Sequence, residues 1–115
     1  MARYENDNYH RIEHRDIERV PGNPWFITSM WLAEWYIARA ETVDDLKGAE
    51  EILEWVADRA LASGTLAEQV NPYTNEPLSV APLTWSHATV VLAVNEYLAK
   101  REALRRAPLA AAKAM

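Results

Sequence analysis

The stretch from Asn23 to Ala40, NPWFITSMWLAEWYIARA, decides the fold of this chain. Asparagine is a favoured helix cap and proline a favoured first helical residue, so Asn23 and Pro24 predict the start of a helix that reaches about Ala40. Apolar residues occupy nearly every side of this helix. A helix that is apolar all round must be buried on all sides. The stretch therefore predicts an inner helix of an all-α protein.

A second, amphipathic helix follows after a short link. Its apolar residues recur at spacings of three and four, and its other face is charged, so it is expected to have one wet side. Thr42 or Asp44 marks the start. The helix is expected to end at about Ser63, with Gly64 in the C-terminal cap.

A third helix is expected from near Thr84 to about Arg105. Its first half, WSHATVVLAV, is again apolar nearly all round. The tail over 106–115 contains Pro108, which is expected to break the helix and leave a frayed end. The chain shows no alternating pattern typical of strands and no internal repeat. The sequence thus predicts three helices over 24–105.

Three helices cannot cover two that are apolar on all sides. The chain is therefore expected to associate with itself or to form part of a larger helical domain. Long loops rich in Tyr, Trp, Asn and charge precede both apolar helices, at 1–22 and 65–83. An arrangement of inner, outer and inner helices explains this spacing, with functional loops at the N-terminal ends of the inner helices.

Composition excludes several classes of protein. The 115 residues suit one domain, and the net charge of −5 argues against nucleic acid as a partner. There is no cysteine, which removes thiol catalysis and suits a reducing compartment. Neither a signal peptide nor a run of membrane-spanning length is visible, so we expect no membrane partner. The lack of cysteine fits a cytoplasmic protein, and an exported protein whose signal lies on a missing N-terminal part is the alternative. Five Trp and five Tyr stand against one Phe. Such a set suits surfaces that combine apolar contact with a hydrogen bond, including sugar sites, although most of these residues are expected to fill the core.

Two histidine patterns were weighed as metal or catalytic sites. His10–His14, HRIEH, fits an inverted zinc-protease motif, but the segment is short, strongly charged and followed by Pro21-Gly22. We interpret it as a solvated charged segment, and we expect no metal and no cofactor. His87 lies in the apolar start of the third helix, where a half-buried histidine with a satisfied hydrogen bond is the favoured interpretation.

Glu68 is the carboxylate of most interest. It lies in TLAEQ, a few residues past the expected end of the second helix. A loop glutamate is usually just solvated. Here Gln69, a donor and acceptor suited to hydroxyl groups, follows directly, and a loop stiffened by three prolines leads to Trp85. A carboxylate near an amide and an aromatic platform has the composition of a sugar site.

Three stretches carry a resemblance to a known family: ARYENDNY (2–9), GNPWF (22–26) and GTLAEQVNPYTNEPLSVAPLTWSHA (64–88). They resemble successive motifs of the catalytic domain of glycoside hydrolase family 15, the glucoamylase family, in the family's order and over about residues 2–98. The family fold is an (α/α)6 toroid of six inner and six outer helices. The resemblance implies that residues 1–115 form the C-terminal part of such a toroid, with active-site loops at 1–23 and 64–84.

The resemblance also implies a reaction. Family members release glucose from the non-reducing ends of α-glucans or short α-glucosides with inversion, which needs a general acid and a general base roughly 6.5–9.5 Å apart. Glu68 matches the base. The resemblance places the acid upstream of the motifs present here, so this chain is expected to be inactive alone. The residues implied in substrate binding are Arg3, Asp7, Tyr9, Trp25, Gln69 and Trp85.

Several alternatives remain open from the sequence. The chain fits one piece of a split enzyme or a truncated product, completed by the missing N-terminal part of the domain or by a second copy. It also fits a non-catalytic helical interaction module with a glucoamylase-like fold. The α-glucoside stays undefined, although PLTWSHA (82–88) is closer to the starch-type enzymes than to trehalases.

Overall fold

Three α-helices dominate the computed structural model, which describes residues 1–9 and 22–114, with the backbone alone over 108–114. They are α1 (Phe26–Arg39), α2 (Lys47–Arg59) and α3 (Thr84–Ala114). A short 3-10 turn, η1 (Asp44–Leu46), precedes α2, and two two-residue strands, β1 (Gln69–Val70) and β2 (Pro77–Leu78), lie in the loop before α3. The prediction of a mostly helical chain is confirmed.

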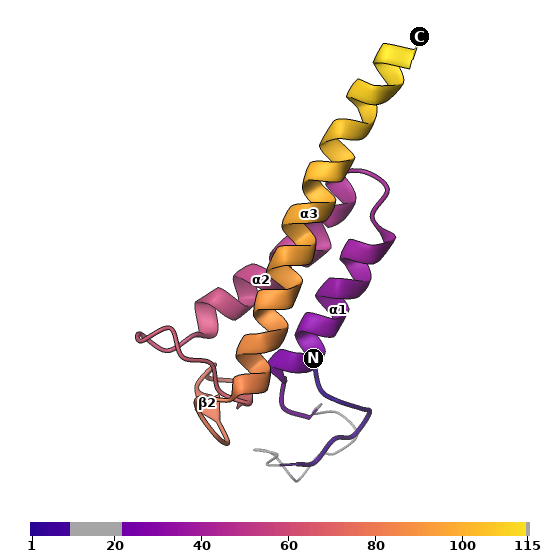
Figure 1. Cartoon of the computed structure of the whole chain (residues 1–115). Coiled ribbons are helices and arrows are strands. Elements are labelled where there is room, and N and C mark those ends of the chain that lie inside the picture. The colour runs from indigo at the N-terminus through magenta and orange to yellow at the C-terminus, as the bar shows by residue number, and fades with distance from the viewer. Residues whose placement is uncertain (10–21, 115) are drawn as a thin grey trace.

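Helix α1 packs against both α2 and α3, whereas α2 and α3 contact each other little. Figure 1 shows that α1 and α3 run in the same direction and begin at the same end of the molecule, and that α2 returns between them in the chain. The N-terminal segment and the hairpin of β1 and β2 lie at that end. The described part of the chain thus holds two parallel helices separated in sequence by one that runs back.

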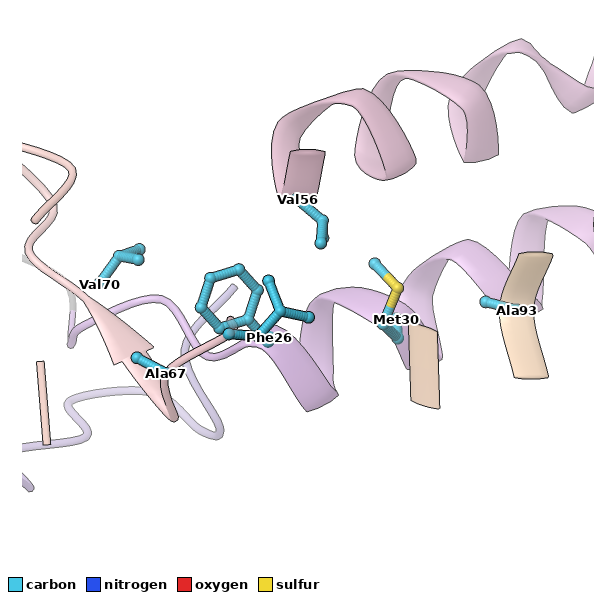
Figure 2. Close-up of a cluster of buried hydrophobic side chains, with 7 residues drawn as sticks. Phe26, Met30, Val56, Ala67, Val70 and Ala93 are labelled. Atoms are coloured by element: carbon cyan, nitrogen blue, oxygen red, sulfur yellow. The ribbon is translucent and has the colours of Figure 1, made fainter. Parts of the chain in front are cut away.

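The core lies along α1 in two clusters. One cluster surrounds Phe26 and Met30, both fully buried, and Figure 2 shows Phe26 beside Ala67 and Val70 of the loop. The other cluster lies along the second half of α1 and joins Ala33 and Ile37 to Leu46. Burying a side chain of the size of Phe or Met contributes roughly 1.5–3 kcal/mol. The first cluster therefore fixes the loop before α3 to the start of α1.

The start of α1 differs from the prediction of an Asn23 cap. The helix begins at Phe26, with Trp25 at the cap position and no side-chain cap bond. The backbone N–H of Phe26 donates to the Glu68 carbonyl over 3.3 Å. The Asn23 side-chain amide donates instead to Oε1 of Gln69 over 3.1 Å. The Asn23 side chain is thus bonded to a tertiary partner and does not cap the helix.

The ends of α2 and α3 also differ from the predictions. Helix α2 ends at Arg59, and a turn follows in which Gly64, with φ of +80°, donates its N–H to the Leu61 carbonyl over 2.7 Å. Helix α3 continues through Pro108 to Ala114, so the predicted break of the helix at Pro108 is wrong. A proline removes one backbone donor from a helix, and the remaining backbone here keeps the helical path.

The loop before α3 contains the strands that the sequence did not show. Gln69 pairs with Leu78 and Val70 with Pro77 in an antiparallel register. Two residues a strand are too few for an alternating pattern to be visible. The expectation of no strand is therefore wrong, and the pair holds the loop as a hairpin.

Apolar side chains of α1 and α3 remain in contact with solvent. We call the aromatic flank the set of Trp31 and Trp35 on α1 and Trp85 and Leu92 on α3, which are 48%, 50%, 53% and 50% exposed. The expectation that a single copy leaves apolar surface uncovered is confirmed. In the part of the chain that the structure describes, no helix is long and apolar enough to cross a membrane.

Candidate functional site

A cavity of about 460 Å³ opens at the end of the molecule where α1 and α3 begin. It gathers side chains from the N-terminal segment, α1, the hairpin loop and α3. Its lining residues are Arg3, Tyr9, Trp25, Ile27, Thr28, Trp31, Glu68 and Trp85. Five of the seven residues implied in catalysis or sugar binding thus meet at one cavity, although they come from sequence positions as far apart as 3 and 85.

Arg3 and Asp7 form a bidentate ion pair beside the cavity. Nε of Arg3 donates to Oδ2 over 2.8 Å, and Nη2 donates to Oδ1 over 2.9 Å. The hydrogen bond from Arg3 holds the pKa of the Asp7 carboxyl below its usual range, and the same bond raises the pKa of Arg3. Asp7 is 1% exposed and does not line the cavity. It lies behind Arg3 and fixes the guanidinium in place.

The Arg3 guanidinium also lies over aromatic rings. It is 4.3 Å from the centre of the Trp25 ring and 5.0 Å from that of Tyr9. Tyr9 and Trp25 contact each other with ring centres 5.8 Å apart. Arginine carries five N–H donors in a planar fork, of which Asp7 takes two. The remaining donors can bind the hydroxyl groups of a ligand in the cavity.

Glu68 presents one carboxylate oxygen that is held and one that is open. Oε2 accepts from the Ser79 hydroxyl over 2.6 Å and from Nε2 of Gln69 over 3.2 Å. Oε1 has no hydrogen-bond partner among residues 1–9 and 22–107. The backbone is fixed as well, because the Glu68 N–H donates to the Val80 carbonyl over 3.0 Å. A positioned carboxylate with a free oxygen on a cavity suits the removal of a proton from water.

Gln69 supports Glu68 from inside the protein. It is fully buried, and its Oε1 accepts from the Asn23 amide while its Nε2 donates to Glu68. Its backbone forms an isolated bridge with Trp25. Like Asp7, Gln69 was expected to bind substrate, and the structure places it behind the cavity wall. Both residues therefore orient the side chains that line the cavity.

Four residues of the site are absent from the sequence prediction: Ile27, Thr28 and Trp31 line the cavity, and Ser79 binds Glu68. Ser79 has φ of +64°, a left-handed conformation that is uncommon outside glycine, and it points its hydroxyl at Glu68. Only the hairpin brings these two residues together, and local sequence gave no sign of it. The sequence predicts burial for the helix that contains Trp31, but Trp31 is 48% exposed. Its ring meets that of Trp85 edge to face, with centres 6.1 Å apart at 65°.

His87, which the structure describes, does not line the cavity. Nε2 of His87 accepts the backbone N–H of Leu66 over 3.0 Å, which confirms the half-buried, satisfied histidine. His10–His14 lies outside the described residues. Among the residues that are described, no group of three or more His, Asp or Glu side chains could hold a metal ion.

Comparison with known proteins gives one family and two related sequences. Residues 40–95, which include Glu68 and Trp85, match the family Glycosyl hydrolases family 15. The chain is 31% identical over 84 residues to the uncharacterized glycosyl hydrolase MJ1610 of Methanocaldococcus jannaschii. It is 35% identical over 86 residues to the isomaltose glucohydrolase of Kribbella flavida.

Each of these matches covers 65% of this chain, but only 14% and 21% of the two relatives. The chain thus spans about a fifth or less of the length of the curated proteins that it matches. No solved structure matches it significantly. The resemblance read from the sequence motifs is confirmed at the level of the family.

Proposed function

We propose, from its place in glycosyl hydrolase family 15, that this chain supplies the general-base side of an inverting glycosidase site. The family match and the names of both relatives support a glycosidase. The observation that carries the assignment to Glu68 is its geometry. One carboxylate oxygen is held by Ser79 and Gln69, and the residue borders a cavity lined by Arg3 and three tryptophans.

In this mechanism Glu68 takes a proton from a water molecule as that water attacks the anomeric carbon. A general acid on the opposite face of the sugar protonates the leaving oxygen, roughly 6.5–9.5 Å from Glu68, which leaves room for the water. The acid comes from another part of the complete catalytic domain. This chain corresponds to three helices of an (α/α)6 toroid, in which α1 and α3 are inner helices.

Sugar recognition follows from the same cavity. The guanidinium of Arg3 offers several donors at fixed angles, which suits a pair of neighbouring hydroxyl groups. The aromatic walls of Tyr9, Trp25 and Trp85 suit the apolar C–H faces of a sugar ring. The substrate is an α-glucan or a short α-glucoside, and isomaltose, named in one relative, is the first to test. No cofactor takes part, and we place the enzyme in the cytoplasm.

The decisive test compares two substitutions in the full-length protein that contains this chain. Glu68→Gln keeps the size of the side chain but cannot accept the proton, so kcat should fall about 10²–10⁴-fold with KM little changed. Arg3→Ala should raise KM as well as lower kcat, because Arg3 is proposed to bind the substrate. Both constants are measured on isomaltose and maltose. Near-parental kcat in the Glu68→Gln variant would show that Glu68 is not the base.

The second candidate is a non-catalytic interaction module. The half-exposed apolar side chains of the aromatic flank favour it, since exposed apolar surface can mark an interface. The glycosidase proposal expects the completed domain to hydrolyse α-glucosides, and the interaction module expects it to be inactive. If the full-length protein binds no α-glucoside and has no acid opposite Glu68, the interaction module is the better description.

A further inference from the structure

We infer that Trp31 forms, with Trp85, the apolar floor of the cavity and sets how far a terminal sugar can enter. The inference rests on the proposed glycosidase function and adds to it a residue that determines substrate binding. Trp31 is not part of any motif that carried the resemblance. It is singled out by its position in the cavity and by its contact with Trp85.

The geometry of α1 gives the cavity two ends. Ile27, Thr28 and Trp31 share one face of the helix, because residues three and four apart are neighbours on its surface. Trp31 lies roughly 9 Å along the helix axis from Trp25, at about 1.5 Å a residue. Trp25 and Arg3 therefore stand at the loop end of the cavity, and Trp31 stands deeper along α1.

The chemistry of the two ends differs. At the loop end, charged and hydrogen-bonding groups surround the guanidinium of Arg3. At the deep end, two indole rings meet edge to face and leave about half of each side chain exposed. A sugar ring has hydroxyl groups at its edge and C–H groups on its faces. A ring bound with its hydroxyl groups at Arg3 would thus rest an apolar face on the corner of Trp31 and Trp85.

Trp35 provides a matched comparison on the same helix. It lies one turn beyond Trp31 and is 50% exposed, against 48% for Trp31. Its ring instead contacts Tyr36 and lies under Arg39, in a separate hollow. If Trp31 were only part of an exposed apolar surface that a partner covers, replacing Trp31 or Trp35 would have similar effects on sugar binding. A role in the cavity predicts an effect on sugar binding for Trp31 alone.

The experiment compares Trp31→Ala, Trp31→Phe and Trp35→Ala in the full-length protein. We expect Trp31→Ala to raise KM for isomaltose and maltose by about tenfold with kcat changed less than about threefold. Trp31→Phe should recover most of the affinity, which also guards against a general folding defect. Trp35→Ala should leave both constants near parental. Equal KM increases for Trp31→Ala and Trp35→Ala, or none for Trp31→Ala, would overturn the inference.

A second measurement separates this inference from the proposed function. In the Glu68→Gln background, where turnover is slow, isomaltose is titrated while tryptophan fluorescence is recorded, with and without Trp31→Ala. Loss of binding only when Trp31 is replaced supports the floor. If Glu68→Gln abolishes turnover but Trp31→Ala binds normally, the inferred role of Trp31 is wrong and the proposed function stands. If the parent neither binds nor cleaves α-glucosides, the proposed function fails and the floor fails with it.

Discussion

The two halves of α1 differ in the hydrogen bonds that their side chains make. In the first half, the Thr28 hydroxyl donates to the Met1 carbonyl, and the Ser29 hydroxyl donates to the Trp25 carbonyl. The first helical N–H donates to the Glu68 carbonyl. The indole Nε1 of Trp25, just before the helix, is buried without a partner among the residues that the structure describes. In the second half, Trp35 is half exposed, and Oε1 of Glu34 is buried with no partner among the described residues.

The difference assigns a role to each half. The first half builds a cavity in which polar groups are held at fixed positions, as catalysis requires. The second half retains surface that this chain does not cover. The radius of gyration, 17.0 Å, is well above the roughly 13 Å of a compact domain of this size, which agrees with incomplete packing. Substitutions near the cavity should therefore change rate, and those further along should change association or stability.

After Glu68 itself, the largest effect is expected at the pair of Arg3 and Asp7. Asp7→Asn removes the charge that holds the guanidinium and leaves the aromatic stack as its main support. We expect kcat/KM of the full-length protein on isomaltose to fall about 10–100-fold, since loss of a charged hydrogen bond costs about 1.5–3 kcal/mol. Glu5→Gln, a nearby exposed carboxylate, is the control. Equal losses in both variants would argue against a specific role of the pair.

The same pair has a defined pH dependence. The folded-state pKa of Asp7 is lowered from 3.8 by the bond to Arg3, so its contribution to stability is present above that value. The contribution is lost as the pH falls through the lower folded-state pKa. In urea unfolding, the free energy of unfolding of the parent should therefore exceed that of the Asp7→Asn variant at pH 7. This difference should become smaller as the pH is lowered. A difference that grows instead would contradict the depressed pKa.

The aromatic flank should control the association of the isolated chain. Residues 1–115 alone are expected to form dimers or larger species, because half-exposed Trp35 and Leu92 favour burial against a partner. For a double Trp35→Gln, Leu92→Gln variant, the dissociation constant of self-association measured by sedimentation should be at least about tenfold higher. Glu54→Gln on the exposed side of α2 is the control. A parent that remains a soluble monomer at high concentration would disprove this prediction.

The three helices and most residues at the cavity could be predicted from the sequence, and the exceptions have physical causes. Apolar periodicity gave the three helices and their order, because helix burial leaves a repeating pattern. It failed at Asn23 and Gln69, whose side chains bond each other across 46 positions, and such contacts leave no local signal. The resemblance located Glu68, Arg3 and their neighbours. It could not separate residues that line the cavity from those behind it, since a motif does not report side-chain direction.

A smaller effect is expected at Ser79, which holds one oxygen of Glu68. Ser79→Ala should lower kcat about 3–10-fold, in line with the roughly 1 kcal/mol of a typical hydrogen bond. Ser79→Gly removes the same hydroxyl but accommodates the positive φ, so it separates backbone strain from the lost bond. Ser63→Ala removes an exposed hydroxyl elsewhere in the loop as the control. Parental kcat in both Ser79 variants would show that the bond does not position Glu68.

The smallest effect is expected at Glu34, on the half of α1 away from the cavity. Burial, and then the charge of Glu96 on α3, raises the pKa of Glu34 above 4.5. An acid with a raised folded-state pKa destabilises the fold once it is ionised, so stability falls as the pH rises from about 4.5 through the raised value. Glu34→Gln removes this cost. It should stabilise the chain by less than about 1 kcal/mol at pH 7, because Glu34 is only partly buried.

Urea unfolding of the isolated chain at one fixed concentration, at pH 4 and at pH 7, measures this effect. The stabilisation by Glu34→Gln should be present at pH 7 and absent at pH 4, where the parent carboxyl is protonated. Glu96→Gln removes only the weaker of the two causes and should stabilise less at pH 7. Neither variant should change association as the flank variants do, since both keep its apolar side chains. A Glu34→Gln chain that is less stable than the parent at pH 7 would mean that the carboxylate has a favourable role on α1, and the contrast between the two halves of the helix would not hold.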